Sequence, residues 1–215
     1  AAADPGARFA VLGGAGVDPQ TIAATPPPTH ATPVAAYVGR MVRAKGADVF
    51  MQAFDMLGSD VALRPLMCGR CDETDPDALP AAQVRDWCAG HGGVWREHVE
   101  DVGEVWRNAD VYVLPARGGE GLPRAMLEAA ASRRPLIVSN VPGCRDFVRN
   151  GIEGLLVTPG DPAALAQAMT RLAGDDTLRE QMGEAARMRL LHGFTEAHVM
   201  QALRQTYAAM FMQRT

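Results

Sequence analysis

The chain is poor in lysine and cysteine and has no long apolar run. No apolar stretch reaches the roughly 18 residues that a membrane-spanning helix needs, so we expect no transmembrane segment. Four cysteines in 215 residues cannot form a disulfide framework, which favours a reducing compartment and a cytoplasmic location. The N-terminus has no basic stretch of the signal-peptide kind and does not begin with Met, so the sequence leaves room for an upstream region.

An excess of basic charge is also missing. The net charge of −4 argues against a general nucleic-acid binder, which would show a basic stripe. The hydrophobic share of 47% and the charged share of 21% are ordinary for a globular domain. A small local basic pocket is still compatible with this composition.

Short apolar runs alternate with amphipathic segments from Val34 onwards. Several of the runs are apolar at both odd and even positions, as expected for strands that are buried on both faces. Alternating strands and helices predict a parallel sheet with right-handed crossovers, which is a doubly wound, Rossmann-like α/β fold. The predicted strands are Val34–Val38, Ala62–Cys68, Gly93–Arg96, Val111–Leu114, Leu136–Ser139 and Leu155–Val157.

The same patterns divide the chain into three parts. Residues 1–33, rich in Ala, Gly, Pro and Thr, are predicted to be an interdomain linker with one short strand at Phe9–Leu12. Residues 34–195 form the main domain, in which Asp161 and Pro162 mark the start of one helix. Residues 196–215 are expected to form a helix whose apolar stripe docks on its own domain or on an absent one.

The first candidate site follows the strand Val34–Val38 and opens a helix. Gly39 is expected to allow a tight turn, and Arg40 and Lys45 could converge on a phosphate at the carboxyl end of the strand. Lys45 is the only lysine in the chain. The alternative is that both cations are solvated on the surface.

The second candidate site is a glycine-rich loop after the strand Val111–Leu114. Pro123 marks the start of a helix there, and free N–H groups at a helix start form an anion site. Glu120 in the loop can face a ligand, and Glu128 lies further along the helix, where a carboxylate suits the vicinal hydroxyls of a ribose. The alternative makes Glu120 a helix-capping acid and Glu128 a surface residue.

Two other motifs carry less information. The segment from Asn140 to Asp146 has the pattern of a turn followed by a helix start. Cys68 and Cys71 form a C-x-x-C that could be half a zinc site or a redox pair, but no standard ligand spacing follows, and buried or loop thiols are favoured.

Taken together, these segments resemble the C-terminal domain of the glycosyl transferases group 1 family, which are retaining enzymes of the GT-B architecture. The resemblance runs from about Gly16 to the end of the chain. It rests on several ordered motifs, of which the paired glutamates, with seven residues between them, are one. The others are Gly16-Val17-Asp18, Gly39-Arg40 with Lys45-Gly46, Pro142-Gly143-Cys144-Arg145-Asp146 and Gly151 to Val157.

The resemblance implies a role for each site residue. Arg40 and Lys45 would neutralise the diphosphate of a nucleotide-sugar donor, after the turn at Gly39. Glu120, the catalytic candidate, would position hydroxyls of the transferred sugar, and Glu128 would hold the ribose. The remaining substrate-binding positions are Gly121 and Leu122, whose N–H groups would face the sugar or phosphate. No metal and no further cofactor would be needed, because the cations and the helix dipole can stabilise the leaving charge.

For function, the resemblance implies the C-terminal half of a glycosyltransferase that builds bacterial surface polysaccharides. The donor would be a nucleotide-diphosphate sugar, most often a UDP-sugar, bound by residues 34–195. The acceptor, a glycan or a lipid-linked sugar, would bind through an N-terminal domain, with peripheral membrane association of the full-length enzyme. A sugar-nucleotide epimerase of related fold and a non-catalytic nucleotide-sugar-binding module are the alternatives.

Three positions depart from the family pattern. Asp146 stands where the family more often has Glu, so we assign it no contact with the donor. Cys71 replaces a second glycine after the strand that ends at Cys68, and Trp95 to His98 replace a glycine-ended strand near the base. The resemblance therefore does not say which residues contact the base.

Overall fold

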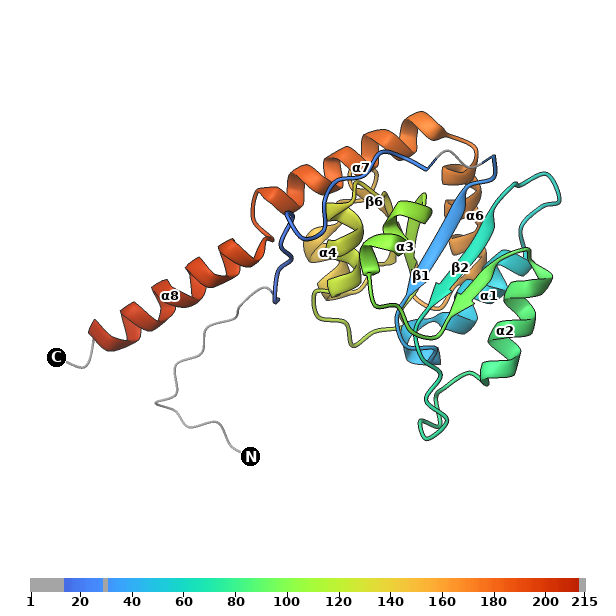
Figure 1. Ribbon diagram of the computed structural model, residues 1–215, viewed down its shortest axis with the longest axis horizontal. Coiled ribbons are helices and arrows are strands. Elements are labelled where there is room, and N and C mark those ends of the chain that lie inside the picture. Colours follow the sequence, from blue (N-terminus) through green and yellow to red (C-terminus); the bar gives the residue numbers. More distant parts are fainter. Residues whose placement is uncertain (1–13, 29–30, 213–215) are drawn as a thin grey trace.

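The computed structural model describes residues 14–28 and 31–212, which are built around a six-stranded parallel sheet (Figure 1). The strand order is β3-β2-β1-β4-β5-β6. The doubly wound α/β fold predicted from the sequence is confirmed. The strands are β1 (Val34–Val38), β2 (Arg64–Cys68), β3 (Val94–Arg96), β4 (Val111–Leu114), β5 (Leu136–Ser139) and β6 (Gly154–Val157).

The central strands are buried on both faces. β1 and β4 lie side by side, with Ala36 opposite Tyr112. On one face Tyr37 packs against Phe50, with ring centroids 5.7 Å apart, and on the other Tyr112 packs against Trp106 at 5.7 Å. Apolar side chains at both odd and even positions therefore find a covering layer, as the sequence pattern predicted.

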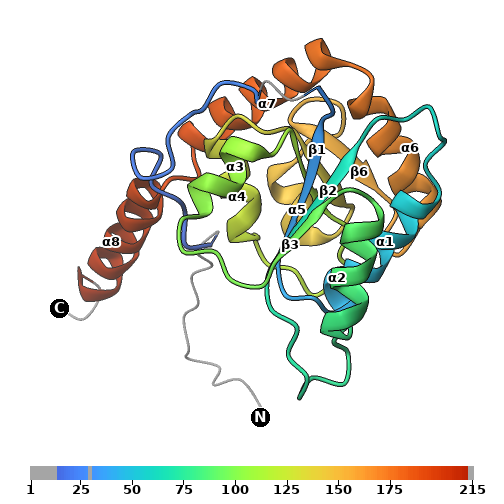
Figure 2. The ribbon, with the colours of Figure 1, turned by 45° about the vertical axis from the view of Figure 1, so that its right-hand side comes forward.

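Helices cover both faces of the sheet (Figures 1 and 2). α1, α2 and α6 lie on one face, where α1 packs against α6, and α3, α4 and α7 lie on the other, where α4 packs against α7. The helices are η1 (Arg43–Lys45, a 3₁₀ turn), α1 (Ala47–Asp55), α2 (Ala81–Gly90), α3 (Val102–Asn108), α4 (Arg124–Ala131), α5 (Pro142–Phe147), α6 (Pro162–Ala173), α7 (Asp176–Leu191) and α8 (Glu196–Met212).

The helix predicted from its cap is α6. The Asp161 carboxylate accepts hydrogen bonds from the first free N–H groups of the helix, and Pro162 is the first helical residue. Leu165, Met169 and Leu172 are buried on one stripe. The local sequence therefore contained both the start of this helix and the face that it buries.

Three predicted strand ends are wrong by one or two residues. β2 begins at Arg64 because the ladder with β1 starts at the pair Val34–Arg64. β3 begins at Val94, one residue later than predicted. β6 begins one residue earlier, at Gly154, where a side chain would collide with the backbone of Leu136 on the neighbouring strand.

The C-terminal helix leaves the body of the domain (Figures 1 and 2). The helix predicted over residues 196–215 is α8, and residues 213–215 lie outside the described residues, as does the strand predicted at Phe9–Leu12. Up to residue 209, the limit of the described side chains, α8 buries no residue, and Tyr207 is 54% exposed. For these side chains, the predicted alternative in which the apolar stripe docks on its own domain is therefore wrong. Val17 pairs with Thr195, which ties the described start of the chain to the start of this helix.

Among the described residues, no helix combines the length and the apolar character that crossing a bilayer requires.

Candidate functional site

The strand order places a topological switch point between β1 and β4. The chain runs outward from β1 to β2 in one direction and from β4 to β5 in the other. Helices α1 and α4 therefore lie on opposite faces of the sheet (Figure 2). In doubly wound sheets, ligands bind beyond the carboxyl ends of the strands at this reversal. Both loops singled out in the sequence, residues 39–46 and 115–123, begin there.

The two loops are fastened to each other through Arg117. Its backbone N–H donates to the carbonyl of Ala44 at 3.0 Å, and its guanidinium donates to the carbonyl of Arg43 at 2.5 Å. The guanidinium also forms a bidentate ion pair with Asp48 in the first turn of α1, at 2.6 and 2.8 Å. Such fork-to-fork pairing fixes orientation as well as distance.

Glycine at position 46 lets the loops approach this closely. Gly46 has φ +76°, a conformation that favours glycine, and a Cβ there would collide with the carbonyl of Pro115. Gly39, predicted to make the tight turn, is not among the residues of positive φ. The glycine of this loop whose conformation is left-handed is therefore Gly46, and the tight turn at Gly39 stays a prediction.

Lys45 and Glu120 meet between the two loops. The Lys45 Nζ lies 2.5 Å from Glu120 Oε1, and their side chains are 29% and 5% exposed. Glu120 is not a helix-capping acid, because Pro123 is the N-cap residue of α4 and no side chain caps that end. A nearly buried carboxylate is costly unless it is paired, and Lys45 is the partner of Glu120 in this arrangement.

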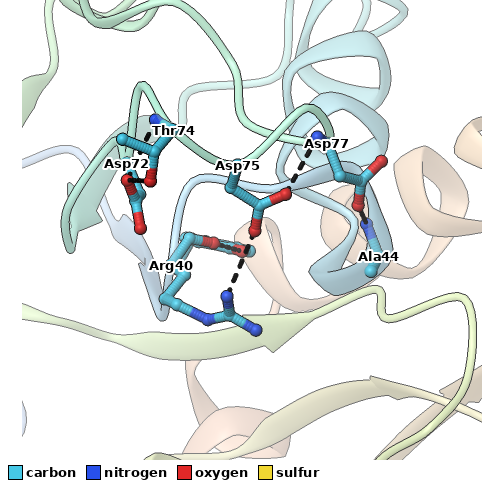
Figure 3. A network of polar contacts seen from close by, with 7 residues as sticks. Arg40, Ala44, Asp72, Thr74, Asp75 and Asp77 are labelled. Atoms are coloured by element: carbon cyan, nitrogen blue, oxygen red, sulfur yellow. Dashed lines mark hydrogen bonds and ion pairs between the residues drawn. The ribbon is translucent and has the colours of Figure 1, made fainter.

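Arg40 points to a different partner (Figure 3). Its Nη1 lies 3.3 Å from Asp75 Oδ2, in the loop that follows β2, and the arginine side chain is 61% exposed. Its backbone is fixed, because the Tyr37 hydroxyl donates to the Arg40 carbonyl at 2.7 Å. The convergence of Arg40 and Lys45 on one phosphate remains a prediction, since each now faces its own carboxylate.

Glu128 lies in α4 and is buried, so the interpretation that makes it a surface residue is wrong. Its Oε1 accepts a hydrogen bond from Arg124 Nε at 2.9 Å, one turn earlier in the same helix. The arginine side chain is largely exposed and can move away from the carboxylate. Glu128 is therefore a buried acid whose present partner lies at the surface.

The glycine-rich loop also rests on α5. Gly143, in the first turn of α5, lies so close to the loop that a Cβ there would collide with the carbonyl of Gly121. Leu122 is partly buried against the core. The sequence predicted a turn and a helix start for residues 140–146 and gave them no role in the site, but their glycine sets the position of the loop that carries Glu120.

Other polar groups under the site were missed by sequence reasoning. Burial, followed by the charge of Glu120, raises the pKa of the Cys144 thiol to about 12. Burial also raises the pKa of Tyr112, whose hydroxyl has no hydrogen-bond partner among the described residues. No single motif links these two residues, which lie far apart in the chain and influence each other only in the folded protein.

Among residues 14–28 and 31–212, no three His, Cys, Asp or Glu side chains gather in a way that could hold a metal ion. Cys68 and Cys71, like the other two cysteines, are free thiols.

One family model and one curated relative each match most of the chain. The family model described as "Glycosyl transferases group 1" matches residues 32–175. CapM, a capsular polysaccharide biosynthesis glycosyltransferase of Staphylococcus aureus, is 30% identical over 174 residues, which are 81% of this chain and 45% of that protein.

Solved structures share the fold. Sucrose-phosphate synthase of Thermosynechococcus elongatus superposes with a TM-score of 0.75 and 25% identity, over 85% of this chain and 46% of the other. HepE of Anabaena, solved with UDP-glucose, superposes with a TM-score of 0.74 and 16% identity, over 83% of this chain and 49% of the other. The chain thus spans about half the length of each of these three proteins.

Proposed function

The chain belongs to the glycosyl transferases group 1 family, and we propose that it carries the nucleotide-sugar site of a retaining glycosyltransferase. The pairing of Lys45 with Glu120 at the switch point is the observation that carries the proposal. It brings together, from two loops 75 residues apart, a cation suited to a diphosphate and an acid suited to sugar hydroxyls.

The donor is proposed to lie across the two loops. Arg40 and Lys45 bind its diphosphate, with Lys45 turning from Glu120 to a phosphate oxygen. Glu120, released from that ion pair, accepts hydrogen bonds from hydroxyls of the transferred sugar. The N–H groups of Gly121 and Leu122 face the sugar or phosphate at the uncapped start of α4, where the helix dipole favours negative charge.

Glu128 is proposed to hold the ribose of the donor. Its carboxylate can accept from both vicinal hydroxyls once Arg124 moves towards solvent. Burial makes this exchange selective, because a buried carboxylate without hydrogen-bond donors is costly.

The reaction proposed for the whole enzyme is a substitution with retention at the anomeric carbon. The bond from that carbon to the diphosphate oxygen breaks, and a bond to the acceptor hydroxyl oxygen forms on the same face. The nucleoside diphosphate leaves with the bonding electrons, and its departing oxygen, on the same face, takes up the proton of the acceptor hydroxyl. Arg40 and Lys45 stabilise the charge that develops on the leaving oxygen, so this chain needs no metal for that step.

Residues 34–195 are proposed as the donor-binding domain, and the segments around them as its links to an acceptor domain. The start of α8 and the segment near Val17 leave the domain together. A glycan or lipid-linked acceptor of surface polysaccharide synthesis is proposed because CapM bears the name of such a pathway. A UDP-sugar is the first donor to test, because HepE is solved with UDP-glucose. This chain alone should bind donor and turn over little.

Calorimetric titration with UDP, GDP and ADP tests the proposal. One nucleotide should bind in the micromolar to millimolar range, and Arg40→Gln with Lys45→Gln should abolish the binding. Arg107→Gln is the matched control, because it removes an exposed arginine that pairs with Asp101 away from the two loops. Thermal unfolding of each variant shows whether it is folded.

The single variant Arg40→Gln tests the site with a change that should not cause misfolding. Arg40 is largely exposed, so its loss should leave the fold intact, whereas loss of Lys45 strands the nearly buried Glu120. Failure of all three nucleotides to bind the wild-type chain would contradict the proposed donor site in this domain.

A further inference from the structure

The loop that follows β2 carries an unusual concentration of acid beside a proposed anion site. Within residues 72–77 it has four acidic side chains: Asp72, Glu73, Asp75 and Asp77. It lies against the loop after β1, since Leu79 N–H donates to the carbonyl of Met41 at 2.7 Å and Met41 N–H to that of Arg70 at 2.9 Å. Negative charge next to a diphosphate site opposes binding, so its presence there calls for a physical role.

The acidic loop is held firmly in place (Figure 3). The Asp77 carboxylate accepts from the N–H of Ala44 at 2.7 Å, and the Asp77 carbonyl accepts from the N–H of Arg43 at 3.0 Å. One oxygen of Asp75 in turn accepts from the N–H of Asp77 at 2.9 Å. The Asp75 carboxylate is therefore fixed relative to the loop that carries Arg40 and Lys45.

Arg40 is the movable partner of this ion pair. It touches Asp75 through a single contact of 3.3 Å between Nη1 and Oδ2, and its side chain is 61% exposed against 27% for Asp75. A guanidinium has five N–H donors, so one long contact leaves most of them for another acceptor. The Arg40 guanidinium can therefore turn to a phosphate, or donate hydrogen bonds to the phosphate and to Asp75 at the same time.

From this geometry we infer that Asp75 is an internal counter-ion of Arg40 that weakens the hold of the site on nucleoside diphosphates. The inference rests on the proposed donor site. In either arrangement of Arg40, the fixed carboxylate offsets part of the positive charge that the diphosphate meets. The consequence is easier release of the nucleoside diphosphate after transfer, at the expense of donor affinity.

Replacing Asp75 with asparagine isolates this charge. The asparagine side chain keeps one oxygen, which can still accept from the N–H of Asp77. The loop should therefore keep its shape, while the negative charge and its contact with Arg40 are lost. Exposed ion pairs correspond to small free energies, so the nucleotide should bind about two- to fivefold more tightly in D75N. A residue that merely supported the structure would give the opposite sign, because loosening the loop weakens binding.

The test is calorimetric titration of wild-type chain, D75N, R40Q and the double variant with UDP, with GDP and ADP in parallel. The affinity gain of D75N should disappear in the R40Q background, because Arg40 transmits it. E73Q is the matched control: it removes the same charge from the same loop, and among the described contacts Glu73 has no ion pair with Arg40. Its affinity should change less than that of D75N. Raising the salt concentration should shrink the gain.

The outcomes separate the two proposals. If the wild-type chain binds a nucleotide while D75N binds it equally or less tightly, the counter-ion inference is overturned and the donor site stands. An equal gain in the R40Q background also overturns it. If the wild-type chain binds no nucleotide, the donor site falls, and the counter-ion inference that rests on it falls too.

Discussion

Replacing Asp48 with asparagine should loosen the two loops of the candidate site from each other. Both oxygens of Asp48 accept from Arg117, and the Asp48 side chain is 17% exposed against 40% for the arginine. Hydrogen bonds to charged groups are worth about 1.5–3 kcal/mol each. Solvent around the guanidinium reduces the contribution of these hydrogen bonds, and asparagine keeps one of the two acceptor atoms. We therefore expect a loss of about 1 kcal/mol in the free energy of unfolding.

Thermal unfolding followed by circular dichroism measures this loss. For a chain of this size, a loss of about 1 kcal/mol lowers Tm by about 2–4 °C. Glu104→Gln is the matched control, since Glu104 also lies in the first turn of a helix and pairs with an arginine, Arg96, at 2.8 Å. That acid is 49% exposed, so its loss should lower Tm by about 1 °C at most.

High salt should abolish the effect of Glu104→Gln and leave most of the effect of Asp48→Asn, because the more buried pair is screened less. Arg117→Lys should behave like Asp48→Asn, since lysine keeps the charge without the fork. If Asp48→Asn lowers Tm no more than its control does, then the ion pair does not hold the loops together and the reasoning is refuted.

Three further outcomes can be measured on the same chain. Gly143→Ala should weaken nucleotide binding by displacing Gly121, while Gly193→Ala, which meets no atom within 4 Å, should not; calorimetry that shows equal binding would contradict the close packing. Burial raises the pKa of all four thiols, but only Cys71 is partly exposed, so iodoacetamide at about pH 8 should label Cys71 in the folded chain and spare the three buried cysteines, as mass spectrometry can show. The hydrogen bond from Arg107 and the N–H of Gly103 lower the pKa of Asp101. This stabilisation is present above the unfolded pKa and lost as the pH falls below about 4, so Asp101→Asn should flatten the fall in Tm between about pH 6 and about pH 3.

The fold could be predicted because its signals are local. Several strands are buried on both faces and apolar at odd and even positions, and the six runs named from the sequence correspond to the six strands of the sheet. The start of α6 is encoded by Asp161 and Pro162 alone. The docking of α8 could not be predicted in this way, because an apolar stripe shows that a helix can pack and not where its partner lies.

The candidate site could be predicted only in part. Lys45 and Glu120 were each placed at the end of a strand, but the sequence does not say that β1 and β4 are neighbours, since β2 and β3 lie between them in the chain. Asp48 with Arg117 and Arg40 with Asp75 were missed because they join segments 69 and 35 residues apart. The acidic run at residues 72–77 was visible, yet its position against Arg40 depends on the strand order.

The two ion pairs of the candidate site explain how a cationic site can exist before its ligand arrives. Lys45 and Arg40 each face a carboxylate, so neither cation is left uncompensated at the end of a buried sheet. The pairs differ in a way that suits the proposed function. Glu120 is nearly buried and needs new hydrogen-bond donors when Lys45 leaves, which sugar hydroxyls can supply, whereas Asp75 is held by the N–H of Asp77 and keeps its charge near Arg40 throughout. A lysine at position 45 suits this exchange. Its ammonium is a compact charge that can move from the carboxylate to a phosphate, whereas an arginine would first have to break a bidentate contact with the carboxylate.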